Sequence, residues 1–140
     1  MKNIFFFFAI LLVSACGTKG ELTVQDVWAR PASAGDNGAA YFIIENGTAT
    51  DDILLSVSSE IASATEVHMS MGDDNGVMSM QMQESVQVPA GDEVEFKPGD
   101  LHIMLVSLNR ELKVGDTFSL ALRFEKGGEI ILQVEVKEQP

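Results

Sequence analysis

The sequence contains a single cysteine, Cys16, among 140 residues. One cysteine excludes an intramolecular disulfide, a thiolate metal cluster and a CxxC redox pair. Basic residues are also scarce, since nine Lys and Arg stand against twenty-one Asp and Glu and give a formal net charge of −12. This charge has the wrong sign for a surface that binds nucleic acid, so we expect no nucleic-acid partner.

Only one long apolar run is present, from Ile4 to Val13 at the N-terminus. It is shorter than the roughly 20 residues that a membrane-spanning helix needs. Lys2 precedes the run and the small residues Ser14 and Ala15 follow it. A charged start, an apolar centre and small residues at the end are typical of a secretory signal peptide.

Cys16 directly follows this signal, and Val13-Ser14-Ala15-Cys16 resembles the cleavage box of bacterial lipoproteins. The resemblance implies that Cys16 becomes the acylated first residue of the mature chain, whereas an ordinary signal with a chance cysteine is the alternative. We therefore expect a lipoprotein signal peptide over residues 1–15, a tether over 16–21 and one domain over 22–137. The expected location is the periplasmic side of the bacterial cell envelope, with a lipid anchor in the membrane.

From residue 22 onward, apolar and polar residues alternate with period two, and turn signals interrupt the alternation every eight to twelve residues. This pattern predicts an all-β domain, either a sandwich or a barrel. The expected strands span residues 22–28, 39–45, 53–57, 64–69, 77–82, 94–96, 101–106, 117–124 and 129–136. A helical turn over 61–66 is an open alternative, because Ala and Glu do not disfavour it.

Both histidines and six of the seven methionines lie between residues 68 and 104. They are His68, Met69, Met71, Met78, Met80, Met82, His102 and Met104. Alternation along a strand puts Met78, Met80 and Met82 on one face. It likewise puts His102 and Met104 on one face, opposite apolar side chains that point to the core. Irregular core filling by methionine, with two structural histidines, is the alternative.

Thioether sulfur is a soft ligand, and together with imidazole it suits Cu(I) better than Zn²⁺, Ca²⁺ or Mg²⁺. A thioether needs no deprotonation and cannot be lost to a disulfide, so such a site keeps its ligands in an oxidising compartment. The residue types therefore predict Cu(I) as the bound metal.

The chain also resembles a known family in the spacing of these residues. His68-Met69 is followed by ten residues, Met80, twenty-one residues and then His102-Ile103-Met104, which is similar to the periplasmic PCu(A)C copper chaperones. The resemblance implies a cupredoxin-like Greek-key β-sandwich that carries Cu(I) to the copper centres of cytochrome c oxidase or to a thiol-bearing assembly factor. It implies the ligands His68, Met80, His102 and Met104, and leaves Met69, Met71, Met78 and Met82 as possible auxiliary ligands.

Other functions fit the residues less well. An electron-transfer cupredoxin needs a cysteine ligand, and the single cysteine lies at the cleavage site. A non-haem iron site written from His68, His102 and Glu66 leaves the methionines unexplained. No GxSxG motif is present, and we expect no enzymatic activity. A copper-sequestering lipoprotein, or an envelope binding module without metal, is the remaining alternative.

Overall fold

The computed structural model describes residues 20–139, so the expected signal peptide and Cys16 lie outside the described part. Ten strands make up the regular structure: β1 (Leu22–Ala29), β2 (Gly38–Asn46), β3 (Asp52–Ser58), β4 (Ala62–Gly72), β5 (Met78–Gln83), β6 (Val86–Val88), β7 (Glu93–Phe96), β8 (Leu101–Leu108), β9 (Thr117–Phe124) and β10 (Gly128–Val136). The all-β class predicted from the alternation is confirmed. Within the described residues, no helix has the length and apolar character that a membrane span requires.

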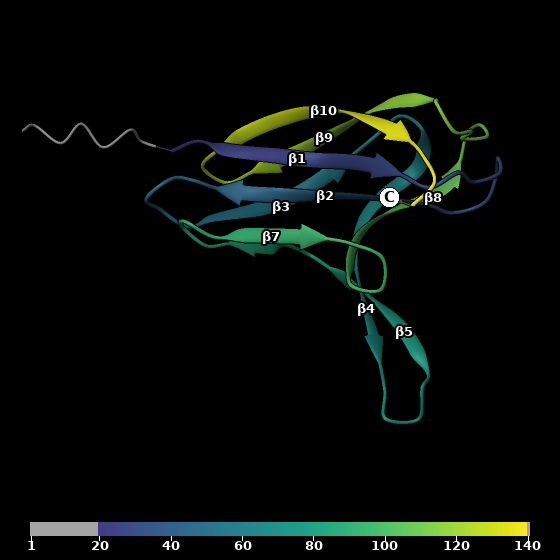
Figure 1. Ribbon diagram of the computed structural model, residues 1–140, viewed down its shortest axis with the longest axis horizontal. Coiled ribbons are helices and arrows are strands. Elements are labelled where there is room, and N and C mark those ends of the chain that lie inside the picture. Colours follow the sequence, from purple (N-terminus) through teal and green to yellow (C-terminus); the bar gives the residue numbers. More distant parts are fainter. Residues whose placement is uncertain (1–19, 140) are drawn as a thin grey trace, which may run out of the picture.

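The strands form one hydrogen-bonded sheet in the order β5-β4-β8-β2-β1-β10-β9-β3-β6, and β7 pairs with β2 off this path. β1 lies at the middle of this order and joins β5-β4-β8-β2 to β10-β9-β3-β6. It pairs antiparallel with β2 and parallel with β10. Figure 1 shows most strands gathered in one body, from which the far ends of β4 and β5 project.

The core of the body follows from the period-two pattern. Along β9, Phe118, Leu120, Leu122 and Phe124 are buried, while Ser119 between them is exposed. Antiparallel pairing brings this face beside the buried residues of β10. Trp28 is also buried and packs on Tyr41, with ring centroids 4.6 Å apart, so it belongs to the core and not to a solvent-facing site.

The structure decides one open alternative and adds one strand that was not expected. Residues 61–66 form no helical turn, because Ala62 and Ala64 pair with Leu108 and Val106 of β8. Tertiary pairing therefore overrides the weak helix propensity of these residues. The short strand β6 was not expected, although two of its three residues, Val86 and Val88, are buried.

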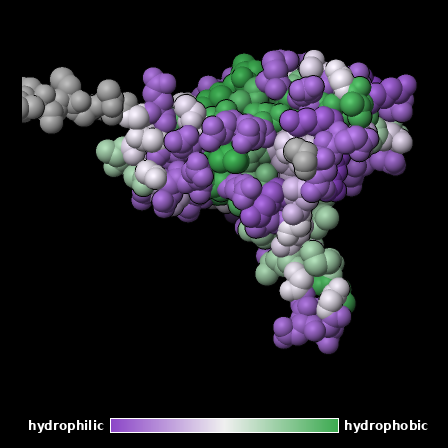
Figure 2. All heavy atoms as spheres, viewed as in Figure 1, coloured by the Kyte–Doolittle hydropathy of each residue, from purple (hydrophilic) through white to green (hydrophobic). Residues whose placement is uncertain are grey.

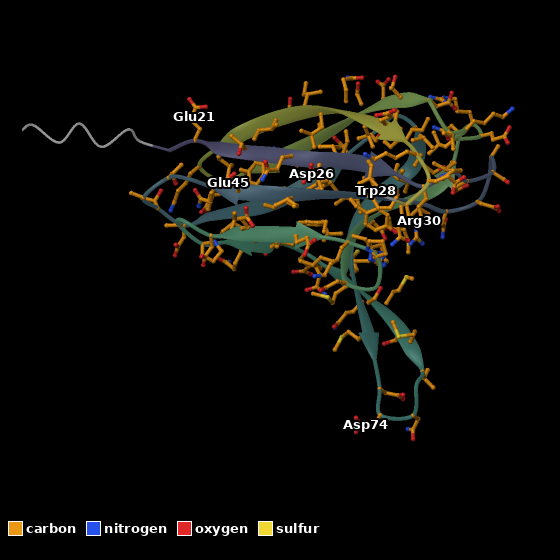
Figure 3. All side chains as sticks on the ribbon, in the orientation of Figure 1. Glu21, Asp26, Trp28, Arg30, Glu45 and Asp74 are labelled. Atoms are coloured by element: carbon orange, nitrogen blue, oxygen red, sulfur yellow. The ribbon has the colours of Figure 1, made fainter. Side chains whose placement is uncertain are left out.

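The projecting segment is the β4–β5 hairpin, in which residues 67–72 pair with residues 78–83. Its turn is closed by the Asp73 carboxylate, whose Oδ1 accepts hydrogen bonds from the backbone N–H groups of Asn75 and Val77 at 2.9 and 2.8 Å. In Figure 2 the residues along the shaft of the hairpin are coloured from white to green, neutral to hydrophobic, and the tip is hydrophilic. Figure 3 places Asp74 at that tip, away from the body.

Candidate metal centre

The candidate ligands are brought together because β4 lies between β5 and β8. His68 on β4 is paired directly with His102 on β8 and with Met82 on β5. In the adjacent register positions, Glu66 pairs with Met104 and Ser70 pairs with Met80. Directly opposed residues of antiparallel strands share a face. All four predicted ligands, His68, Met80, His102 and Met104, therefore lie on one face of this three-stranded segment.

His102 is held in one orientation by the backbone. Its ring Nδ1 lies 2.9 Å from the carbonyl oxygen of Asp100, which also accepts a hydrogen bond from the Ser70 N–H at 3.2 Å. A carbonyl oxygen only accepts, so Nδ1 carries the proton and the lone pair is left on Nε2. The residue is only 5% exposed, so the ring is buried as well as hydrogen-bonded. In the neutral ring, Nε2 is therefore the nitrogen that can bind a metal ion.

His68 is oriented by a carboxylate. Its Nε2 lies 2.8 Å from Oε2 of Glu66, while its Nδ1 is buried and has no hydrogen-bond partner. An ionised carboxylate accepts, so Nε2 is the donor and Nδ1 carries the lone pair. An unpaired buried acceptor is costly and needs an explanation. The rings of His68 and His102 are neighbours, with centroids 6.0 Å apart and planes at 49° to each other. Coordination of a metal ion would use the unpaired Nδ1 of His68.

A surface pocket of about 460 Å³ lies at this place. Met80, His102 and Met104 line it together with Arg30 and Ala39, the residue of β2 that pairs with Met104. His68 does not line the pocket and lies beside His102 in the sheet. Met80 is 60% exposed, so the pocket combines an enclosed imidazole with a thioether that solvent reaches.

The possible auxiliary methionines fall on two faces. Met78 and Met82 alternate with Ser79 and Gln81 and share the face of Met80. Met69 and Met71 precede and follow Ser70 on β4, and their side chains point to the opposite face from His68. The structure thus brings Met78 and Met82 to the side of the pocket, and Met69 and Met71 to the other side of the hairpin.

Arg30 supplies the one cation of the pocket lining among the described residues. Its guanidinium lies 5.6 Å from the centroid of the Tyr41 ring, which also lines the pocket. Burial raises the pKa of the Tyr41 hydroxyl, and the positive charge of Arg30 opposes this effect. Tyr41 is therefore a neutral wall of the pocket at physiological pH.

From the sequence, Glu66 was considered only as a ligand of the rejected iron site. Its hydrogen bond to His68 was missed, as were the Asp100 carbonyl and Arg30. The sequence does predict that Glu66 can contact His68, because Glu66 lies two residues earlier and hence on the same face of a strand. The Asp100 carbonyl and Arg30 gave no such signal, since a main-chain acceptor and a contact between distant strands leave no local pattern.

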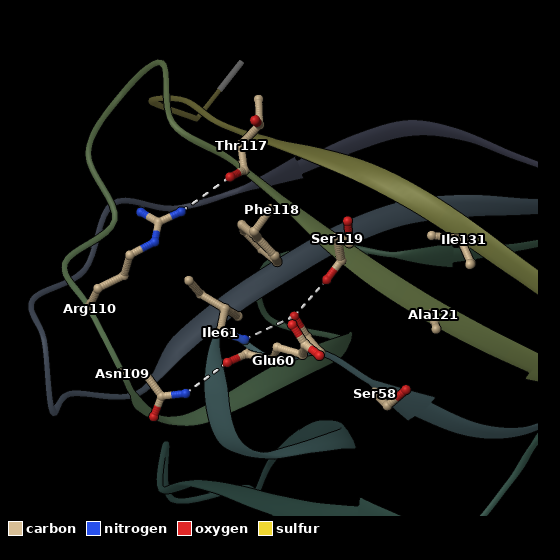
Figure 4. A pocket seen from close by; sticks show the side chains of 11 residues that line it. Ser58, Glu60, Ile61, Asn109, Arg110, Thr117, Phe118, Ser119, Ala121 and Ile131 are labelled. Atoms are coloured by element: carbon tan, nitrogen blue, oxygen red, sulfur yellow. Dashed lines mark hydrogen bonds between the residues drawn. The ribbon is translucent and has the colours of Figure 1, made fainter.

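Other kinds of site are less well supported in residues 20–139. This part of the chain contains no group of three or more His, Cys, Asp or Glu side chains placed to hold a metal ion, which counts against the iron site of His68, His102 and Glu66. A larger pocket, of about 690 Å³, lies between the ends of β3, β8 and β9, and Figure 4 shows its lining. None of its lining residues is His or Met.

Comparison with known proteins agrees with this architecture. The model of a family described as "Putative lipoprotein LpqE-like" matches residues 22–136. A protein of Leifsonia xyli subsp. xyli named "Putative lipoprotein Lxx21020" is 30% identical over 135 residues, which cover 93% of this chain and 80% of the relative.

Solved structures of similar fold are PCuAC domains. The copper-bound PCuAC domain from PmoF2 superposes with a TM-score of 0.70 at 22% identity, over 86% of this chain and 96% of that domain. The solution structure of Cu(I)-DR1885 from Deinococcus radiodurans gives a TM-score of 0.62 at 25% identity, over 85% of this chain and 81% of that one. The cupredoxin-like fold expected from the sequence is confirmed. The chain therefore belongs to the LpqE-like family and has the fold of the PCuAC domains.

Proposed function

We propose that this protein is an extracytoplasmic copper chaperone that binds one Cu(I) with His68, Met80, His102 and Met104. The observation that carries the proposal is the shared pocket of Met80, His102 and Met104, with His68 paired to His102 on the same face. Two imidazoles with defined lone pairs and two thioethers form a soft donor set that suits Cu(I). The copper-bound PmoF2 domain and Cu(I)-DR1885 support the same choice of metal.

The mode of action follows from the unequal exposure of the ligands. His102 is buried and fixed by the Asp100 carbonyl, whereas Met80 is exposed on the projecting hairpin. An incoming ligand of an acceptor protein therefore reaches the ion from the side of Met80 while the imidazole still holds it. Copper passes by ligand exchange and remains Cu(I) throughout, so the role requires no enzymatic step.

We further propose that the acceptor is a copper centre of cytochrome c oxidase or a thiol-bearing assembly factor, as the PCu(A)C resemblance implies. A thiolate binds Cu(I) more strongly than a thioether, so transfer from this site to a thiol-bearing acceptor is downhill. Acylation of Cys16 would hold the carrier at the periplasmic face of a bacterial membrane, and the lipoprotein description of the family supports this anchor.

An anaerobic titration tests copper binding. The purified full chain competes with a chromophoric chelator for Cu(I), and the same is done with His102→Ala and Met104→Leu. We expect one Cu(I) per chain. Either variant should lose affinity about tenfold or more, because removing even a group that only hydrogen-bonds to a metal ligand commonly costs about tenfold.

Met69→Leu is the matched control, since Met69 is the same residue type on the same hairpin but faces away from His68. Its Cu(I) affinity should equal that of the wild type. Equal affinity of wild type, His102→Ala and Met104→Leu would rule out the proposed site, and several ions per chain would favour sequestration over delivery.

A further inference from the structure

The hairpin carries a row of three methionines, Met78, Met80 and Met82, which are 63%, 60% and 55% exposed. They follow one another at every second position of β5, about 6.6 Å apart along the strand. Only Met80 lines the pocket, and the proposed function has no use for Met78. Large apolar side chains in a contiguous exposed row usually serve binding.

The position of the Met78 sulfur adds a second observation. Met78 pairs with Gly72 across the hairpin, and a β-carbon built on Gly72 would lie 3.3 Å from the Met78 Sδ. The absence of a side chain on Gly72 thus leaves room for the sulfur to lie over β4, on the face that bears Met80. Two thioethers are thereby presented on one exposed surface, and one of them belongs to the pocket.

The chemistry of these residues distinguishes a ligand site from an apolar contact surface. Valine or isoleucine would cover an apolar contact equally well and would favour a strand more. Thioether sulfur differs from those side chains mainly in being a soft ligand with a flexible stem. The carboxylates of the acidic tip are poor rivals for Cu(I), because carboxylate oxygen is a hard ligand and Oδ1 of Asp73 already accepts hydrogen bonds from the turn.

We propose that Met78 and Met80 form an outer capture site for Cu(I), from which the ion enters the pocket of His102 and Met104. This inference rests on the proposed function and adds a route by which the site is filled. In the transfer step, the Met78–copper bond is replaced by a bond to the His102 nitrogen or the Met104 sulfur. Copper stays monovalent, and the neutral His102 ring, whose Nδ1 donates to the Asp100 carbonyl, binds through the Nε2 lone pair.

The experiment measures the rate of loading separately from the final affinity. The full chain is mixed under anaerobic conditions with a Cu(I) complex of a small chromophoric chelator, and absorbance follows the transfer. A small donor is used so that docking between proteins plays no part. The test variant is Met78→Leu, and the matched control is Met71→Leu, a methionine of the same hairpin that is 50% exposed on the opposite face.

We expect Met78→Leu to load at least about fivefold more slowly, because a tethered capture site raises the local concentration of the ion. Its equilibrium affinity should stay within about twofold of the wild type, because the pocket ligands are intact. Met71→Leu should match the wild type in both measurements, and circular dichroism checks that both variants are folded.

Equal loading rates of Met78→Leu and wild type would overturn the capture site. So would equal slowing of Met78→Leu and Met71→Leu, because that result would reflect the number of exposed sulfurs and not their face. Failure of the wild type to bind Cu(I) at equilibrium would overturn the proposed function, and the two failures are therefore distinguishable.

Discussion

His68 and Glu66 are joined by a hydrogen bond of 2.8 Å between Nε2 and Oε2, while the other ring nitrogen of His68 is buried without a partner. The two residues lie two positions apart on β4 and share its pocket-side face. The carboxylate thus decides which nitrogen of His68 bears the proton. In many metal sites a carboxylate accepts a hydrogen bond from the N–H of a ligating imidazole. The carboxylate then fixes the tautomer and the orientation of the ring.

The first prediction concerns this contact. Glu66→Leu removes the acceptor, so we expect the His68 ring to lose its single tautomer and the Cu(I) affinity to fall about tenfold. Glu66→Gln retains an acceptor oxygen and should keep most of the affinity. Nitrogen chemical shifts of the His68 ring, measured by NMR without metal, report the tautomer directly. An unchanged tautomer and affinity in Glu66→Leu would show that Glu66 has no positioning role.

The second prediction separates the two sides of β8. Ile103 is fully buried in the core, whereas its neighbour His102 faces the pocket. Ile103→Ala should lower the free energy of unfolding by about 2–5 kcal/mol and leave the Cu(I) affinity of the folded protein unchanged. His102→Ala should lower the Cu(I) affinity about tenfold or more. It should also cost some stability, because the ring is buried and hydrogen-bonded to the Asp100 carbonyl. Chemical denaturation and chelator competition measure the two quantities, and a loss of Cu(I) affinity in Ile103→Ala as large as that in His102→Ala would contradict the assignment of faces.

The third prediction is a pH dependence of stability that arises from Asp52. Burial raises the pKa of the Asp52 carboxyl, but hydrogen bonds from the N–H groups of Lys126, Ile53 and Gly127 outweigh it and hold the pKa below its ordinary value. The group is charged more readily in the folded than in the unfolded chain, so its contribution is present above the unfolded pKa of about 3.9. That contribution is lost as the pH falls through the lower, folded pKa.

Asp52→Asn tests this linkage. An amide has one acceptor oxygen, so at least one of the three N–H groups loses its partner, and we expect a loss of about 1–3 kcal/mol at pH 7. Thermal unfolding of both proteins between pH 7 and pH 2.5 should show the difference shrinking as the pH falls. A constant difference over this range would mean that Asp52 ionisation does not contribute to stability.

The fourth prediction concerns membrane attachment. Cys16→Ala removes the only thiol that acylation could use, and one or more acyl chains would otherwise hold the protein to lipid. We expect the wild type in the membrane fraction and Cys16→Ala in the soluble fraction after cell breakage. Membrane recovery of the variant equal to that of the wild type would argue against acylation.

Period-two alternation was sufficient to predict most of the strands, because a half-buried strand places buried residues at every second position, as in Thr117–Phe124. It also predicted the common face of Met78, Met80 and Met82. The same rule separates Met69 and Met71 from His68, although these residues were grouped together as possible auxiliary ligands. Three-residue β6 is too short for any period to be read.

The pairing of His68 with His102 had no local signal. These residues lie on strands that are far apart in sequence and become neighbours only because β8 pairs with β4 along its length. The resemblance to the PCu(A)C chaperones implied which residues would belong to one site. It did not indicate which ring nitrogen is free, because that depends on the Asp100 carbonyl and the Glu66 carboxylate, which the folded chain brings to the rings.

X-ray absorption of the full chain loaded with one Cu(I) reports the ligands of the ion themselves. We predict a mixed first shell of imidazole nitrogen and thioether sulfur, from which Met104→Leu removes sulfur and His102→Ala removes nitrogen. A first shell without sulfur, or one that neither substitution alters, would contradict this prediction.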